Sequence, residues 1–100
     1  MKGRLLVVDD EPSICDALRA TLESAGHAVH TSENAIQAMA ELERQQFDVV
    51  LADLSLPRVS GLELLDSVKR SWPTVEVIVV TGQGSIATAV DAIKRGAYHY

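Results

Sequence analysis

The chain has 100 residues, of which 47% are hydrophobic, and this length is enough for one domain with a single core. Nine Lys and Arg residues against fourteen Asp and Glu residues give a net charge of −5, and the cations are scattered, which argues against direct binding of nucleic acid. The single cysteine excludes a disulfide framework, and the lack of a long apolar run or a signal-peptide core favours a soluble protein of the cytoplasm without membrane contact.

Short apolar runs alternate along the chain with segments of helical periodicity. The run Leu5–Val8 is apolar at every position, which predicts a strand buried on both faces. In chain order, the pattern predicts strands at Leu5–Val8, Ala28–Thr31, Phe47–Ala52 and Val75–Val80, helices over about residues 12–25, 35–45, 61–72 and 85–96, and the start of a fifth strand at Ala97–Tyr100. Strands and helices that alternate in this way predict a parallel sheet of the doubly wound α/β class.

The ends of the predicted helices carry local signals. Pro12 suits the first turn of a helix, and Gly26 is a natural residue after its end. Asn34 is placed to cap the second helix. The apolar spacing of the first helix predicts an inward face that includes Ile14, and Cys15 near that face is expected to pack as a small hydrophobic residue.

Acidic and hydroxyl side chains follow the predicted strands. Asp9 and Asp10 come directly after the first strand, Asp53 after the third and Thr81 after the fourth. Ligand sites of doubly wound sheets lie outside the carboxyl ends of the strands. If the first and third strands are neighbours, three carboxylates and one hydroxyl therefore meet at one edge of the sheet.

Carboxylates that meet in this way need a positive charge or a proton. Two of them repel by about 4 kcal/mol at a separation of roughly 4 Å and an effective dielectric constant near 20. Ligands that are all oxygen favour a hard cation, and few carboxylates favour Mg²⁺ over Ca²⁺. Mg²⁺ commonly accompanies phosphoryl groups, and a carboxylate beside it can form an aspartyl phosphate. The alternative, that these acids are only solvated charges, weakens when three lie at one edge.

Three motifs resemble the receiver domains of bacterial two-component response regulators. They are Leu6–Glu11, Asp53–Pro57 with Gly61, and Val80–Gly82. The resemblance covers residues 4–100, and it implies a flavodoxin-like fold with strand order 2-1-3-4-5. It also implies that Asp53 accepts a phosphoryl group from a sensor histidine kinase.

The resemblance implies a role for each further residue of the site. Asp10 would be a direct Mg²⁺ ligand, with Asp9 as its partner through water, and Ser55 would offer its backbone carbonyl. Thr81 would be the switch hydroxyl, and Tyr100 falls at the aromatic switch position of the fifth strand.

The end of the chain differs from the family pattern. The family places a lysine in the fifth strand, a few positions beyond Tyr100, and a last helix after it. We therefore expect residues 1–100 to be a C-terminally truncated receiver domain. The segment Thr81–Tyr98 looks most like receivers of NtrC-type transcriptional activators, which carry an ATPase and a DNA-binding module downstream, and a homodimer is compatible with this resemblance.

Three functions compete on these residues. The first is a regulatory switch, not an enzyme, in which phosphorylation of Asp53 controls a downstream output, here transcription. The second is an interaction domain that works without phosphorylation, for which the loss of an acid or of Thr81 would be expected, although all are present. The third is an Mg²⁺-dependent phosphohydrolase, which would need a second acid two residues after the nucleophile, where this chain has Ser55.

Overall fold

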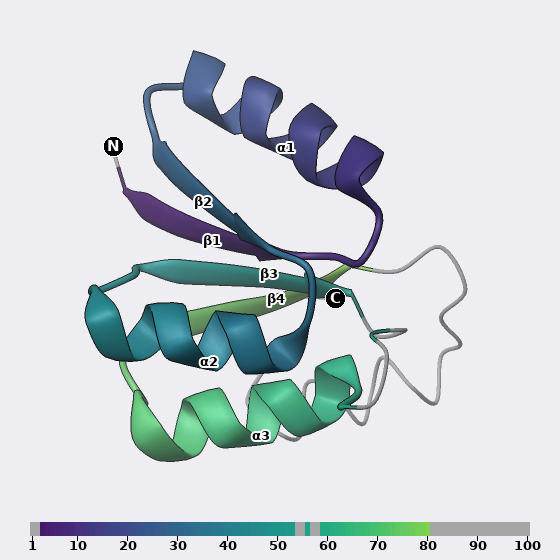
Figure 1. Ribbon diagram of the computed structural model, residues 1–100. Coiled ribbons are helices and arrows are strands. Elements are labelled where there is room, and N and C mark those ends of the chain that lie inside the picture. Colours follow the sequence, from purple (N-terminus) through teal and green to yellow (C-terminus); the bar gives the residue numbers. More distant parts are fainter. Residues whose placement is uncertain (1–2, 54–55, 57–58, 81–100) are drawn as a thin grey trace.

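The computed structural model describes residues 3–53, 56 and 59–80, which form a parallel sheet with helices on both faces (Figure 1). The elements in chain order are β1 (Arg4–Val8), α1 (Pro12–Ser24), β2 (Ala28–Ser32), α2 (Ala35–Arg44), β3 (Val49–Asp53), α3 (Gly61–Ser71) and β4 (Glu76–Val80). The strand order is β2-β1-β3-β4, so the doubly wound, flavodoxin-like prediction is confirmed for these four strands. The helix predicted over residues 85–96 and the strand at Ala97–Tyr100 lie outside the described residues.

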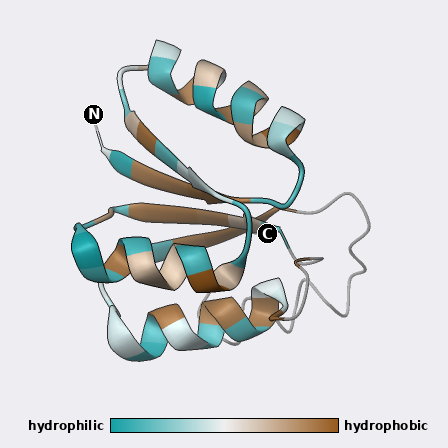
Figure 2. Ribbon diagram, in the orientation of Figure 1, coloured by the Kyte–Doolittle hydropathy of each residue, from teal (hydrophilic) through white to brown (hydrophobic). Residues whose placement is uncertain are grey.

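β1 is buried on both faces, whereas β3 and β4 alternate between buried residues and more exposed ones. α1 covers one face of the sheet, and α2 and α3 cover the other (Figure 1). The larger core lies on the α2 and α3 side and includes Leu6, Val50, Leu65 and Val77, each fully buried. Figure 2 shows β1, β3 and β4 as mostly hydrophobic along their length. The burial of Leu5–Val8 on both faces of β1 explains why this run is apolar at every position instead of alternating.

A smaller apolar cluster lies between α1 and the sheet. It contains Val7, Cys15 and Val29, with Leu18 and Leu22 partly buried beside them. The expected packing of Cys15 is confirmed, since this side chain is 5% exposed.

The predicted inward position of Ile14 is wrong. Ile14 is 39% exposed, and Cys15 is the buried residue of α1. Successive residues of a helix differ by about 100° around its axis, so a helix that turns Cys15 to the sheet turns Ile14 away from it.

Local signals set the ends of the helices. Pro12 occupies the first turn of α1, and Gly26 after that helix has a φ of 95°, a conformation that glycine adopts without strain. The side chain of Asn34 accepts a hydrogen bond of 2.8 Å from the backbone N–H of Gln37 and caps α2, as predicted. Ser60 caps α3 in the same way, which the sequence analysis did not predict.

The pairing of β1 with β3 aligns their ends. In the parallel register Val8 lies beside Ala52, so the residues that follow these two, Asp9 and Asp53, emerge next to each other. β3 also pairs with β4, where Asp53 lies beside Val80. The carboxyl edge of the sheet therefore gathers the end of all three strands. No helix among the described residues has the length and apolarity needed to cross a lipid bilayer.

Candidate functional site

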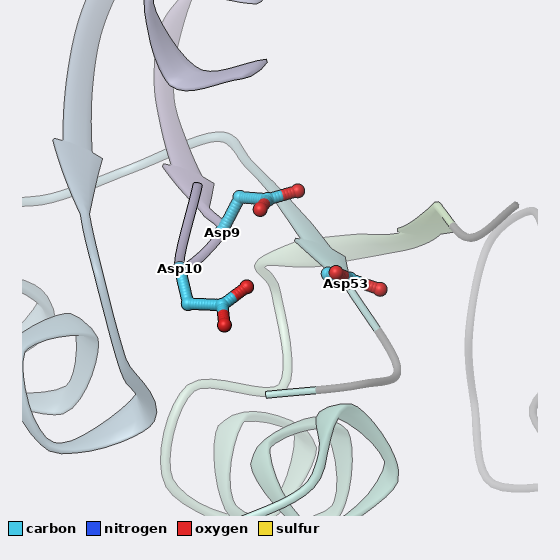
Figure 3. A group of neighbouring side chains, drawn as sticks. All are labelled: Asp9, Asp10 and Asp53. Atoms are coloured by element: carbon cyan, nitrogen blue, oxygen red, sulfur yellow. The ribbon is translucent and has the colours of Figure 1, made fainter. Parts of the chain in front are cut away.

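Three aspartates meet where β1 and β3 end. One carboxylate oxygen from each of Asp9, Asp10 and Asp53 lies within 4.8 Å of the others. Figure 3 shows the three side chains together, Asp9 and Asp10 from the turn after β1 and Asp53 from the end of β3. The predicted convergence of these acids is therefore observed.

The three carboxylates differ in exposure. Asp9 is buried, with 6% of its surface exposed, whereas Asp53 is half-buried and Asp10 is exposed. The cluster thus has one member in the protein interior and one in contact with solvent. A ligand can reach the group from the side of Asp10.

Asp9 is held by contacts from three directions. Its backbone N–H donates to the carbonyl of Ser32 at 3.0 Å, which ties it to the end of β2. Its carboxylate oxygen Oδ1 accepts a hydrogen bond of 2.9 Å from the backbone N–H of Glu11. Its carbonyl oxygen lies 3.4 Å from the thiol sulfur of Cys15, which donates to it. The contacts of Glu11, Ser32 and Cys15 with Asp9 were not predicted from the sequence, because two of them use backbone atoms of these residues and the third depends on how α1 packs.

The electrostatics of the cluster favour a positive charge. Burial raises the pKa of Asp9 above its ordinary value of 3.8, and the charges of Asp53 and Asp10 raise the pKa further. The N–H of Glu11 offsets part of this rise by stabilising the ionised carboxylate. A cation that binds between these carboxylates would relieve their mutual repulsion.

The donor set fits a hard divalent cation. The three ligand atoms are all carboxylate oxygens, and Mg²⁺ prefers oxygen ligands and keeps several waters. Within the residues that the structure describes, no other group of three His, Cys, Asp or Glu side chains comes together in this way. The residues present therefore suit Mg²⁺, with the exposed side of Asp10 left to solvent.

The remaining predicted site residues, Ser55, Thr81 and Tyr100, lie outside the described residues. The described residues on either side of residues 54–55 are Asp53, at the end of β3, and Leu56, which is buried in the larger core. Thr81 follows directly on Val80, the residue that pairs with Asp53.

Comparison with known proteins gives the family. The response regulator receiver domain matches residues 5–100 of this sequence. The chain belongs to this family. NtrX, a nitrogen assimilation regulatory protein of Azorhizobium caulinodans, is 43% identical over 102 residues, a match that covers 100% of this chain and 22% of NtrX. The chain thus spans about a fifth of the length of this relative.

Solved receiver structures share the fold. The beryllofluoride-activated NtrC4 receiver domain dimer matches with a TM-score of 0.90 and 42% identity, over 95% of this chain and 78% of that one. A response regulator from Burkholderia pseudomallei, solved with a phosphorylated aspartic acid, a calcium ion and citrate, matches with a TM-score of 0.91 and 36% identity, over 97% of this chain and 57% of that one. The resemblance to receivers of NtrC-type regulators is confirmed by these relatives.

Proposed function

We propose that Asp53 of this receiver domain accepts a phosphoryl group from a sensor histidine kinase, with Mg²⁺ held by Asp9, Asp10 and Asp53. The observation that carries the proposal is the approach of these three carboxylates to within 4.8 Å at the carboxyl edge of the sheet. The Burkholderia pseudomallei relative, solved with a phosphorylated aspartic acid and a calcium ion, supports it.

The transfer is a displacement at phosphorus. A carboxylate oxygen of Asp53 attacks the phosphorus of the kinase phosphohistidine, and the P–N bond breaks as the imidazole nitrogen leaves with its electron pair. When bound, Mg²⁺ would neutralise charge on the phosphoryl oxygens. Asp9 is fixed by the N–H of Glu11 and Asp10 stands at the open side, so these two would hold the cation together with one oxygen of Asp53, whose other oxygen carries out the attack.

We propose that Thr81, Ser55 and Tyr100 complete the switch. Asp53 pairs with Val80, and Thr81 is the residue after Val80. The hydroxyl of Thr81 would therefore donate to a phosphoryl oxygen on Asp53. Ser55 would offer its backbone carbonyl to Mg²⁺. Tyr100 would change position as Thr81 moves, and phosphorylation would thereby favour one conformer over another.

The partners in this proposal are those of a regulator longer than this chain. Residues 1–100 would be part of a receiver domain followed by an output domain, an ATPase with a DNA-binding module, that controls transcription. The 22% coverage of NtrX supports a longer protein, and the NtrC4 receiver dimer supports a homodimer. A histidine kinase partner would place the domain in the cytoplasm.

An interaction domain that works without phosphorylation is the alternative. Such a domain would gain nothing from three carboxylates that repel each other, one of them buried. Replacement of any one by a neutral residue would stabilise it. The presence of all three therefore favours the switch.

The proposal is tested with Mg²⁺ and a small phosphodonor such as acetyl phosphate, on the full-length protein. Intact mass spectrometry should show the added mass of one phosphoryl group, and EDTA should prevent the addition. Asp53→Asn should abolish it, whereas Asp66→Asn, a half-buried acid on α3 outside the cluster, should leave it in place. Phosphate uptake by the Asp53→Asn protein equal to that of the native protein would reject the assignment.

A further inference from the structure

The thiol of Cys15 joins the first turns of α1 to the loop that carries the acidic cluster. Its sulfur lies 3.4 Å from the backbone carbonyl oxygen of Asp9 and donates to it. That carbonyl belongs to the peptide that links Asp9 to Asp10. The contact is buried, and the side chain of Cys15 is 5% exposed.

Cys15 is also fixed on its other side. Its side chain belongs to the small cluster with Val7 of β1 and Val29 of β2, so it packs directly against the sheet. The backbone N–H of Cys15 donates to the carbonyl of Glu11 at 3.2 Å. Glu11 is also the residue whose backbone N–H donates to the carboxylate of Asp9. The turn from Asp9 to Glu11 is therefore held at both of its ends through α1.

From this geometry we infer that Cys15 is a positioning residue for the metal site: its thiol fixes the peptide between Asp9 and Asp10 and so keeps the exposed carboxylate of Asp10 within the cluster. Asp10 follows the bonded carbonyl directly, and rotation of this peptide would move its side chain away from Asp53. Asp9 has an additional anchor in the carbonyl of Ser32, so Asp10 is the acid that depends most on the thiol. The inference rests on the proposed binding of Mg²⁺ by this cluster.

Three substitutions separate positioning from packing. Cys15→Ala removes the donor and a small volume, whereas Cys15→Ser keeps a donor at nearly the same place. Val29→Ala is the matched control, because Val29 is 4% exposed and belongs to the same cluster but its side chain has no hydrogen-bonding group. Urea unfolding of each variant gives the loss of general stability.

Metal binding is measured on the full-length protein with Mn²⁺ as the probe, by electron paramagnetic resonance of the free ion, with Mg²⁺ as competitor. Asp10→Asn, which lacks one carboxylate of the cluster, is the comparison that shows whether the native protein binds the ion there. We expect Cys15→Ala to weaken binding at the cluster about fivefold, the effect of one hydrogen bond, while Cys15→Ser restores it to within about twofold of the native value. Val29→Ala should lower stability but leave the dissociation constant unchanged.

Two results would overturn the role of Cys15 alone: a native dissociation constant in the Cys15→Ala protein, or a loss in Val29→Ala as large as that in Cys15→Ala. A native protein that binds no more Mn²⁺ than Asp10→Asn would overturn the proposed metal site and the role of Cys15 with it. Metal binding by the native protein, compared with Asp10→Asn, thus distinguishes a failure of the proposed metal site from a failure of the role of Cys15 alone.

Discussion

The backbone N–H of Glu11 donates a hydrogen bond of 2.9 Å to the carboxylate of Asp9, two residues earlier in the chain. This bond fixes Asp9 within its own turn, with one carboxylate oxygen occupied by the protein. Asp10, the next residue, is exposed at the open side of the cluster. Asp9 is thus held by the protein while Asp10 faces solvent, so substitutions of these two neighbouring aspartates should affect metal binding and stability differently.

Replacement of Asp10 should separate metal affinity from stability. Asp10→Asn removes one charged oxygen ligand, so Mg²⁺ binding should weaken by about tenfold or more at neutral pH. The same change relieves repulsion from Asp9 and Asp53, so the metal-free protein should unfold at a higher urea concentration. Competition against Mn²⁺ and urea denaturation measure the two effects.

Asp16→Asn is the control for this prediction. Asp16 is an exposed acid on α1 that is not a member of the cluster, and its substitution removes the same charge. If it changes metal affinity as much as Asp10→Asn does, the effect belongs to net charge and not to ligation.

The raised pKa of Asp9 predicts how the stability of the metal-free protein depends on pH. Because the folded protein holds the proton of this carboxyl more tightly than the unfolded chain does, ionisation of Asp9 opposes folding. Its unfavourable contribution is absent below the ordinary value of 3.8 and grows as the pH rises through the higher pKa of the folded state. The side chain in Asp9→Asn cannot ionise, but its amide oxygen can still accept the hydrogen bond from the backbone N–H of Glu11.

The measurement is the free energy of unfolding of the native and Asp9→Asn proteins in EDTA, from acidic to neutral pH. The difference between them should increase in favour of the variant as the pH rises, and Mg²⁺ should reduce it. A difference that stays constant across this range, or that shifts in favour of the native protein, would contradict the assigned direction.

Burial should decide the cost of shortening a side chain. Leu65 on α3 is fully buried in the larger core, whereas Ile36 on α2 is 63% exposed. Leu65→Ala should lower the free energy of unfolding by about 2–5 kcal/mol, and Ile36→Ala should change it by less than about 0.5 kcal/mol. Chemical denaturation of both variants tests this contrast. An equal loss of unfolding free energy in the two variants would contradict the exposed position of Ile36.

Much of the fold could be predicted because local signals and burial agree. The uninterrupted apolar run of β1 reflects a strand that is covered on both faces, and the cap at Asn34 depends only on residues up to Gln37. The acidic site could be predicted from position alone, because parallel strands end at one edge and β1 and β3 are neighbours.

The contacts that hold the site could not be predicted in the same way. Helical spacing defines an apolar stripe on α1, but Ile14 and Cys15 are adjacent, and only packing against the sheet decides which of them turns inward. The carbonyl of Ser32 reaches Asp9 because β2 lies beside β1, and a backbone acceptor leaves no signature in the sequence. These contacts depend on tertiary structure, so residue types alone do not reveal them.

The central claim is that the phosphoryl group is carried by the carboxylate of Asp53, and its chemical linkage gives the most direct test. An acyl phosphate is reduced by borohydride to an alcohol, which converts the modified aspartate to homoserine. After incubation of the full-length protein with Mg²⁺ and acetyl phosphate, borohydride reduction and peptide mass spectrometry should find homoserine at position 53 and aspartate at positions 9 and 10. Homoserine at either of those two positions, or phosphate uptake with none at position 53, would contradict the account.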